Sequence, residues 1–433
     1  MIGGGIHPVS FKQVSRYRPI QNFSSPEKVI LPLSQHTGAP AIPVVKKGEP
    51  VKKGQMIAQA NGFVSSPVHA SIAGKVSAVE YCYLPSGRRS LAIVMENDGS
   101  QAEIESTETD WHNLSPETII DCVRQAGIVG MGGAAFPTHV KLTVPEAREA
   151  KLVILNGCEC EPFLTCDEQV FREETSAVIE GLQIICQATG AEEACVAIEG
   201  EKGDLAQIIR NHLSGLPVKL KILPEKYPQG SEKQLIEALT GLQVPCGKLP
   251  IDVGCLVFNV QTALAVQKAV KKGWPLVERV LTVSGVVEQP VNLRVPIGTT
   301  VADILKFCGI SLKEHQRVIM GGPMMGQVLP ELNIPVLKGT SGLVIWNQGG
   351  KFSEEAACIR CGRCLQACPM KLAPAEIGRQ ARLENWEACQ KLHVNDCLEC
   401  GCCAYVCPSR LPLVAWFKWA KAELRKAFAG EKK

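Results

Sequence analysis

Half of the twenty cysteines in this 433-residue chain lie between residues 358 and 407, where one spacing pattern occurs twice. In each copy two residues separate the first three cysteines, three residues separate the third from the fourth, and a proline follows the fourth. A tight loop with this spacing brings three thiolates to one [4Fe–4S] cubane, while the cysteine before proline ligates the other cubane. The pattern predicts a first cluster on Cys358, Cys361, Cys364 and Cys407, and a second on Cys368, Cys397, Cys400 and Cys403.

Zinc is the alternative metal for paired cysteines of this kind. A tetrahedral zinc site has no use for a third cysteine at the same spacing and a fourth before proline, found twice in one segment. Cys402 and Cys389 remain outside the pattern, and Cys402 is expected to serve packing. Two adjacent cubanes pass electrons singly, but they identify neither donor nor acceptor.

The composition is that of an ordinary globular protein of two to four domains, with 45% hydrophobic and 21% charged residues. A formal net charge of +3 and the lack of a basic run give no support for a nucleic-acid partner. The first residues lack the features of a signal peptide. The most apolar long window, residues 253–270, is interrupted by Asn259, Gln261 and Gln267, so we expect no transmembrane segment.

Changes of texture along the chain predict a multidomain α/β and β architecture. Residues 26–100 are rich in Gly, Pro and Val, with turns at short intervals, which indicates an all-β module. The repeated phrases at 45–50 and 51–56 resemble the barrel-sandwich hybrid of lipoyl and biotinyl carrier domains. The expected regions are this module (1–110), an α/β domain (111–276), a β-grasp (SLBB) module (277–350), a ferredoxin-like helical domain (351–412) and an amphipathic tail (413–433).

Local signals place the elements of the middle regions. Ser115-Pro116-Glu117 has the chemistry of a helix start, and Gly127 that of its end. Strands are expected at 152–155, 194–198 and 256–258, alternating with helices near 168–188, 204–213, 232–239 and 260–271, as in a parallel α/β layer structure. A hairpin at 279–287 and 291–295 precedes a helix that Thr300 opens and Gly309 closes.

A glycine-rich loop, residues 127–141, follows the first helix of the α/β region. Glycines let the backbone approach a phosphate or a flat ring, and Lys141 is placed to neutralise a phosphate. A tight structural turn explains the glycines equally well when the loop is taken alone.

Four segments in the same order resemble the NADH-oxidising flavoprotein subunit of respiratory complex I. They are residues 130–141, Asn156–Pro162, Tyr227–Glu232 and Phe258–Thr262. The resemblance implies an FMN site on Gly130, Gly132, Lys141, Asn156, Glu159, Tyr227, Gly230 and Asn259. It also implies that NADH stacks near Phe136, with Glu161 and Glu232 beside it. The chain departs from that family's pattern at Met131, Cys158 and Ser231, and a solvated loop is the alternative for Glu159 and Glu161.

Nearly the whole chain, in domain order, resembles the RnfC family of the Rnf electron transport complex. The similar segments include residues 3–8, 32–40, 66–70 and 321–326 together with the paired cluster motifs. The resemblance implies a peripheral subunit on the cytoplasmic side of the inner membrane, within an ion-translocating ferredoxin:NAD⁺ oxidoreductase. It implies electron transfer between NAD(H) and ferredoxin through FMN and both clusters. Its implied partners are a ferredoxin-like subunit and the integral membrane subunits of the complex, with ferredoxin reached indirectly.

Two other functions remain open from the residues. One is a cobalamin reductase of the microcompartment type, whose barrel-like domain follows the clusters, whereas here the barrel comes first. The other is a wiring subunit that carries clusters but has lost its nucleotide, an alternative that Met131, Cys158 and Ser231 keep open. The tail, residues 411–426, is amphipathic and suits either docking to a membrane or partner, or packing on its own cluster domain.

Overall fold

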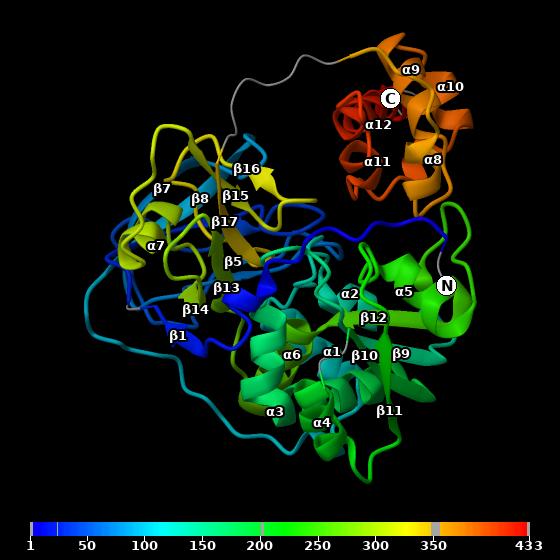
Figure 1. The fold of residues 1–433 in the computed structure, drawn as a ribbon. Coiled ribbons are helices and arrows are strands. Elements are labelled where there is room, and N and C mark those ends of the chain that lie inside the picture. Colours follow the sequence, from blue (N-terminus) through cyan, green and yellow to red (C-terminus); the bar gives the residue numbers. More distant parts are fainter. Residues whose placement is uncertain (1–2, 24, 201–202, 348–355, 431–433) are drawn as a thin grey trace.

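A computed structural model describes residues 3–23, 25–200, 203–347 and 356–430 of the chain. Figure 1 shows a β-rich part beside an α/β domain, with a small helical cluster region above the α/β domain. The amino-terminal segment, drawn in blue, runs between the cluster region and the α/β domain (Figure 1).

The α/β domain is built on a four-stranded parallel sheet in the order β11-β10-β9-β12. Its strands are β9 (Leu152–Gly157), β10 (Glu193–Glu199), β11 (Val218–Leu223) and β12 (Cys255–Asn259). The three predicted strands are confirmed. β11 escaped prediction because it is an edge strand with exposed lysines, not a continuous apolar run. The order reverses at β9, and ligands of such sheets bind beyond the carboxyl ends of the strands at this reversal.

The helices of this domain are α1 (Pro116–Gln125), α2 (Thr138–Leu142), α3 (Cys166–Thr189), α4 (Gly203–Leu213), α5 (Glu232–Thr240) and α6 (Val260–Lys272), with 3₁₀ turns η2 (Trp111–Asn113) and η3 (Pro250–Val253). The predicted start of α1 is confirmed, because the Ser115 side chain accepts a hydrogen bond from the Thr118 amide and Pro116 occupies the first turn. α3 and α6 lie side by side (Figure 1), and a Cβ at Gly181 would clash with the Ala263 carbonyl. Glycine is therefore required where the two helices cross.

The barrel-sandwich module consists of two small antiparallel sheets. One contains β2 (Lys28–Pro32), β8 (Arg89–Asn97), β7 (Gly74–Tyr83) and β4 (Pro50–Val51), and the other β3 (Ile42–Pro43), β5 (Met56–Gln59) and β6 (Val68–His69). Val29, Leu31, Ile57, Ile93 and Met95 are fully buried between them. The all-β prediction for residues 26–100 is confirmed.

The β-grasp module holds a mixed sheet in the order β1-β14-β13-β17-β15-β16. It contains β13 (Glu278–Gly285), β14 (Val291–Pro296), β15 (Gln316–Met320), β16 (Gln327–Val328), β17 (Gly342–Asn347) and helix α7 (Val301–Phe307). Thr300 caps α7 as predicted, accepting from the Asp303 amide at 3.2 Å. The outer strand β1 (Ile20–Asn22), which follows the turn η1 (Lys12–Val14), comes from the start of the chain and pairs with β14. The sequence pattern placed β1 in the barrel-sandwich module (1–110). This was wrong, because a three-residue edge strand carries no local signal for a partner far along the chain.

The cluster region contains α8 (Arg363–Ala367), α9 (Pro374–Arg382), α10 (Trp386–Lys391), η4 (Val394–Asp396), α11 (Cys402–Tyr405) and α12 (Leu413–Gly430). Leu413, Phe417 and Ala420 of α12 are buried against Ile377 and Ala381 of α9. Of the two alternatives for the tail, the structure therefore has the helix packed on its own cluster region. Within the described ranges, no helix combines the length and apolar character that a membrane span requires.

Candidate functional site

Two asparagines mark the carboxyl end of the parallel sheet at its reversal point. Asn156 is the next-to-last residue of β9, and it pairs in register with Asn259, the last residue of β12. The side-chain amide of Asn156 donates to the Gly230 carbonyl (2.8 Å), and its side-chain oxygen accepts from the backbone N–H of Cys158 (2.9 Å). Asn259 caps α6 through Gln261 (2.9 Å). The structure thus brings together residues far apart in sequence that the complex I resemblance assigned to FMN.

The glycine-rich loop lies against these strand ends. The Gly130 amide donates to the Phe136 carbonyl (2.8 Å), which closes the loop on itself. A Cβ at Gly132 would lie 3.5 Å from the Cβ of Asn259, and Gly132 is exposed. The loop is anchored through the backbone of Met131, whose amide donates to the Thr262 hydroxyl (2.9 Å). Because Met131 acts through its backbone, its departure from the family pattern leaves the shape of the loop intact.

Lys141, on α2, carries the positive charge of this crevice. Its ammonium donates to the Val257 carbonyl of β12 (2.5 Å), lies 5.3 Å from the Phe258 ring centroid and forms an ion pair with Glu232. Glu232 is the first residue of α5, and the preceding Ser231 side chain makes no capping hydrogen bond. An ammonium beside a helix amino-terminus without a side-chain cap is a suitable place for a phosphate.

The backbone at Cys158 explains why glycine occupies position 230. A Cβ at Gly230 would clash with the Cys158 carbonyl oxygen. Cys158 itself is buried and contributes its amide to Asn156. Cys158 stands where the complex I flavoprotein pattern has an acidic residue. The difference therefore lies in a side chain that packs inside the domain.

Glu159 and Glu161 are held by backbone amides, so the alternative of a solvated loop is wrong for both. Glu159 is buried and accepts from the amides of Asp167 (3.1 Å) and Glu168 (3.4 Å) at the start of α3. Glu161 accepts from the amides of Met324 (3.0 Å) and Met325 (2.9 Å) in the β-grasp module. Burial raises the pKa of Glu161 to about 7.

The residues assigned to NADH face different neighbours. Glu232 pairs with Lys141, whereas Glu161 turns to the β-grasp loop at 321–326, and a Cβ at Gly322 would clash with its carboxylate. Phe136 is half-buried and contributes its carbonyl to the glycine-rich loop. The geometry joins Glu232 to the FMN residues and gives Glu161 a role in docking the β-grasp module.

Tyr227 connects the α/β domain to the cluster region. It is 2% exposed, and its hydroxyl donates to the Cys400 carbonyl at 2.8 Å. Its backbone pairs with Ile6, and the neighbouring Gly5 amide donates to the Ala367 carbonyl (2.9 Å). A Cβ at Gly4 would clash with the Cys368 carbonyl, so the amino-terminal glycines let the chain pass between the two parts. The Tyr227 hydroxyl, which the complex I resemblance assigned to FMN, therefore contacts the cluster region.

Cys368 from the first motif and Cys397, Cys400 and Cys403 from the second line one cavity of about 350 Å³, opening included. Leu372, Val414 and Phe417 are among the other residues that line it. Burial raises the pKa of the Cys397 thiol to about 11 and that of Cys403 to about 12. Four cysteines around an apolar cavity fit the donor set of a [4Fe–4S] cluster, and they are the set expected for the second cluster.

The four cysteines expected for the first cluster are more accessible. Cys358 and Cys361 are exposed, while Cys364 and Cys407 are half-buried beside the core of the cluster region. Ile359, Leu365 and Tyr405 are exposed in the same segments. Of the cysteines outside the pattern, Cys389 lies in the core and Cys402 packs with Ile6 and Tyr227, in agreement with a packing role.

Three charged residues around the crevice were not predicted from the sequence. Asp167 accepts from the side-chain amides of Asn259 (2.5 Å) and Gln261 (2.9 Å). Arg279 is fully buried and donates to the Met131 carbonyl (2.9 Å), and burial lowers its pKa. Lys338 donates to the carbonyls of Pro67 (2.6 Å) and Gly127 (2.8 Å), and burial lowers its pKa to about 7. No local pattern in the sequence marked any of these three residues.

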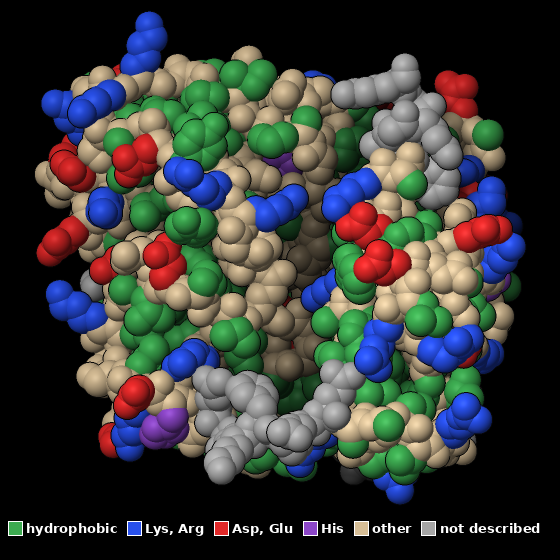
Figure 2. All heavy atoms as spheres, turned by 90° about the horizontal axis from the view of Figure 1, so that it is seen from above, with side chains coloured by type: hydrophobic (Ala, Val, Ile, Leu, Met, Phe, Trp, Pro, Cys, Tyr) green, Lys and Arg blue, Asp and Glu red, His purple; other side chains and the backbone are tan. Residues whose placement is uncertain are grey.

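These contacts lock the modules around the loop, since Lys338 comes from the β-grasp module and Pro67 from the barrel. Seen from above, the surface is hollowed between the cluster region and the β-rich part (Figure 2). Lysine and arginine side chains lie along the rim of this hollow (Figure 2).

Sequence families match the chain in the order of its modules. The RnfC barrel sandwich hybrid domain matches residues 1–100, and the Nuo51 FMN-binding domain matches 123–268. The SLBB domain matches 280–328, and a 4Fe-4S dicluster domain matches 357–411. The predicted fold class, an FMN-binding domain and a two-cluster domain are confirmed.

Curated relatives match almost end to end. One subunit of the proton-translocating ferredoxin:NAD⁺ oxidoreductase complex of Clostridium ljungdahlii is 44% identical, over 99% of this chain and 95% of the relative. The corresponding subunit of the Na⁺-translocating complex of Acetobacterium woodii is 41% identical, over 97% and 96%. That of the ion-translocating oxidoreductase complex of Rhodobacter capsulatus is 41% identical, over 98% and 83%.

Two solved structures share the fold. Chains of an NAD⁺-reducing [NiFe]-hydrogenase match with TM-scores of 0.51 in the H₂-reduced state and 0.50 in the air-oxidized state. The first covers 72% of this chain and 63% of that chain at 21% identity, and the second 65% and 55% at 23%. The full-length relatives, together with the barrel-first module order and the paired cluster motifs, show that the chain belongs to the RnfC family, whose members are subunits of ion-translocating ferredoxin:NAD⁺ oxidoreductase complexes.

Proposed function

We propose that this chain passes electrons between NAD(H) and two [4Fe–4S] clusters through FMN, as a peripheral subunit of an ion-translocating ferredoxin:NAD⁺ oxidoreductase. The observation that carries the proposal is the cavity lined by Cys368, Cys397, Cys400 and Cys403, which Tyr227 joins to the α/β domain. The names of the full-length relatives support the same activity.

FMN held here would supply the conversion between the two-electron hydride chemistry of NADH and the one-electron chemistry of the clusters. The chain's own residues hold and orient it. Gly130 and Gly132 would allow close approach of the loop, Lys141 and the start of α5 would bind the phosphate, and Asn156, Gly230 and Asn259 shape the crevice. Glu159 fixes the start of α3, and the Tyr227 hydroxyl fixes the contact with the cluster region. For NADH we retain Phe136 and Glu232, and Glu232 is placed best by its contact with Lys141. Glu161 was expected beside NADH as well, but its carboxylate is held by the Met324 and Met325 amides, so we assign it to docking the β-grasp module.

The burial of the cysteines indicates the order in which electrons pass through the two clusters. Ligands of the second cluster lie against Tyr227 of the α/β domain, whereas Cys358 and Cys361 of the first cluster are exposed. The path therefore runs from the nucleotide to the second cluster, then to the first cluster, and then to a partner. The partners proposed are the ferredoxin-like subunit and the integral membrane subunits of the complex, with ferredoxin reached indirectly. The proposed location is the cytoplasmic side of the inner membrane.

The order is testable with one ligand variant for each cluster. Cys361→Ala should lose the first cluster and leave a second cluster that NADH still reduces at the wild-type rate. Cys397→Ala should lose the second cluster and leave a first cluster that NADH reduces far more slowly. Iron assays and stopped-flow absorbance, with electron paramagnetic resonance of the reduced samples, measure both outcomes. Fast reduction of the first cluster in Cys397→Ala would contradict the order.

The two alternative functions are less well supported. The cobalamin reductase alternative does not fit a chain that carries its barrel first and that Rnf-type subunits match along its full length. The alternative of a wiring subunit without nucleotide predicts eight irons and no flavin. The intact crevice, with Lys141 and the paired asparagines in place, favours the flavin-containing form.

A further inference from the structure

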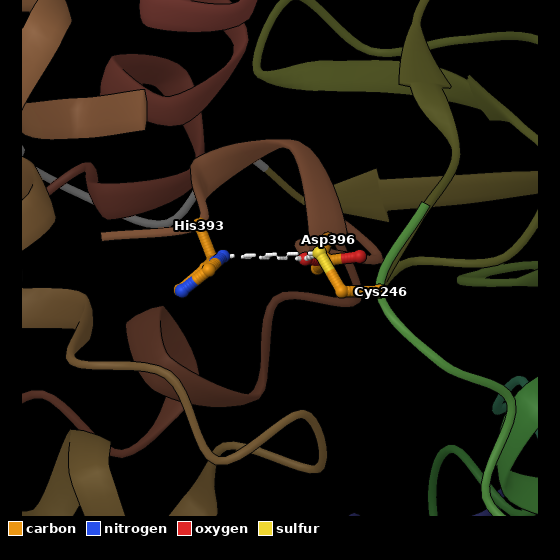
Figure 3. Close-up of side chains that lie close together, drawn as sticks. All are labelled: Cys246, His393 and Asp396. Atoms are coloured by element: carbon orange, nitrogen blue, oxygen red, sulfur yellow. Dashed lines mark hydrogen bonds and ion pairs between the residues drawn. The ribbon is translucent and has the colours of Figure 1, made fainter. Parts of the chain in front are cut away.

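A cysteine, a histidine and an aspartate meet at the boundary between the α/β domain and the cluster region (Figure 3). Cys246 lies between α5 and η3, whereas His393 and Asp396 lie at the two ends of η4. The Cys246 sulfur is 3.7 Å from His393 Nδ1 and 2.6 Å from Asp396 Oδ2. His393 Nδ1 is 3.9 Å from the same carboxylate oxygen. None of the three belongs to the cluster pattern or to the strand-end crevice.

We infer that Cys246, His393 and Asp396 form a binding site for one zinc ion that joins the α/β domain to the cluster region. Thiolate, imidazole and carboxylate are the three side-chain ligands that zinc takes in proteins, at about 2.0–2.3 Å. A tetrahedron with those bond lengths separates sulfur from nitrogen by about 3.5 Å and nitrogen from oxygen by about 3.3 Å. The observed separations of 3.7 and 3.9 Å therefore need only small side-chain movements.

The short Cys246–Asp396 contact is a thiol hydrogen bond, and zinc replaces its proton. The S–H bond breaks, the proton leaves to solvent, and a Zn–S bond forms with no change of oxidation state. The sulfur and the oxygen then separate to about 3.5 Å, the spacing of two ligands on one zinc ion.

The surroundings leave the site open to a metal ion. Lys233 lies 3.9 Å from Asp396 Oδ1, the oxygen that does not face Cys246, so Oδ2 remains turned toward the other ligands. The side chain of His393 is 64% exposed and that of Asp396 is 13% exposed. Cys246 is exposed as well, so solvent supplies both the entry path and a water molecule for the fourth position.

From this position, zinc would affect both the docking of the cluster region and the potential of the second cluster. Cys246 and the η4 residues come from different parts of the chain, so the ion holds the cluster region against the α/β domain. Asp396 also precedes Cys397, a proposed ligand of the second cluster, and a nearby positive charge favours the reduced form of a cluster. We therefore expect zinc to raise the midpoint potential of the second cluster.

The test uses the full chain with both clusters loaded, stripped of adventitious metal with a mild chelator and handled without oxygen. Zinc chloride is titrated in competition with a chromophoric chelator, and iron and sulfide are assayed on the same samples. The wild type should take up one zinc ion per chain with one sulfur and three nitrogen or oxygen neighbours by zinc X-ray absorption. Cys246→Ser and His393→Gln should each weaken zinc binding at least tenfold, whereas Cys308→Ser and His212→Gln, which change a cysteine and a histidine elsewhere, should not.

Three results would overturn the inference. These are no zinc uptake by the cluster-loaded chain, uptake that survives both Cys246→Ser and His393→Gln, and a zinc spectrum with several sulfur neighbours, which would place the ion on cluster cysteines. Unchanged iron content in the variants shows that any loss of zinc binding is local. A redox titration with and without zinc supplies an independent readout, since the upward shift of the second cluster should occur in the wild type and vanish in Cys246→Ser.

Discussion

The buried hydroxyl of Tyr227 is one contact between the α/β domain and the ligand loop of the proposed second cluster. It donates to the Cys400 carbonyl at 2.8 Å, and the side chain is almost fully enclosed. Burial raises the pKa of this phenol well above its ordinary value, so the hydroxyl stays protonated and can donate throughout the physiological pH range. Tyr227→Phe removes this one donor and keeps the ring.

The expected cost follows from what remains after the change. Because the ring still fills its place, little apolar burial is lost. The Cys400 carbonyl, however, loses its donor inside a contact from which water is excluded, which costs about 1–3 kcal/mol. The free energy of unfolding should fall by that amount. Reduction of the second cluster by NADH should slow, because the contact that sets its distance from the crevice is weakened, while flavin reduction by NADH stays unchanged.

The assays are denaturant unfolding and anaerobic stopped-flow absorbance, which follows flavin and clusters separately. Tyr405→Phe is the matched control, since Tyr405 lies in the cluster region but is 57% exposed. Tyr405→Phe should change the free energy of unfolding by less than about 0.5 kcal/mol. If Tyr227→Phe behaves like Tyr405→Phe in both stability and cluster reduction, the proposed coupling through Tyr227 is wrong.

Three further predictions address the crevice, the cluster ligands and the β-grasp contact. Gly230→Ala places a Cβ against the Cys158 carbonyl and should cost about 1–3 kcal/mol of stability with loss of bound FMN, whereas Gly203→Ala, where nothing lies within 4 Å, should be neutral in unfolding and flavin assays. Cys368→Ala should lower bound iron from about eight to about four per chain, and Cys402→Ala, which removes a buried packing thiol, should keep about eight; equal iron in both would contradict the crossed ligand set. Glu161 has a folded-state pKa of about 7 against an ordinary value of 4.5, so its contribution to stability is present below pH 4.5 and is lost as pH rises through 7. Between pH 6 and 8 the wild type should lose about 1 kcal/mol more stability than Glu161→Gln, and parallel pH profiles from denaturant unfolding would refute this.

Features with local causes were predictable from the sequence. The cysteine spacing identified both cluster motifs, because the ligand loops are short and continuous. The start of α1 followed from Ser115 and Pro116, and that of α7 from Thr300, because a capping side chain reaches only its own first turn. The α/β alternation identified the parallel sheet, and its reversal between β9 and β12 places Asn156 beside Asn259.

Features that depend on distant parts of the chain were not predictable from these patterns. β1 pairs with β14 from a distant part of the sequence, and the Tyr227 hydroxyl finds its partner at Cys400. Arg279 looks like a strand residue of ordinary charge, yet folding buries it beneath the glycine-rich loop. The proposed zinc ligands Cys246 and His393 carry no shared motif, because only the docking of two regions brings them together.

The central claim, electron transfer from NADH through flavin to the clusters, is tested most directly by anaerobic ultraviolet–visible titration of the cluster-loaded chain with NADH. Flavin and iron are assayed on the same sample. We expect about one FMN and eight irons per chain, with both chromophores bleaching as NADH is added. Eight irons without flavin, and spectra that NADH leaves unchanged, would contradict it and leave a two-cluster wire.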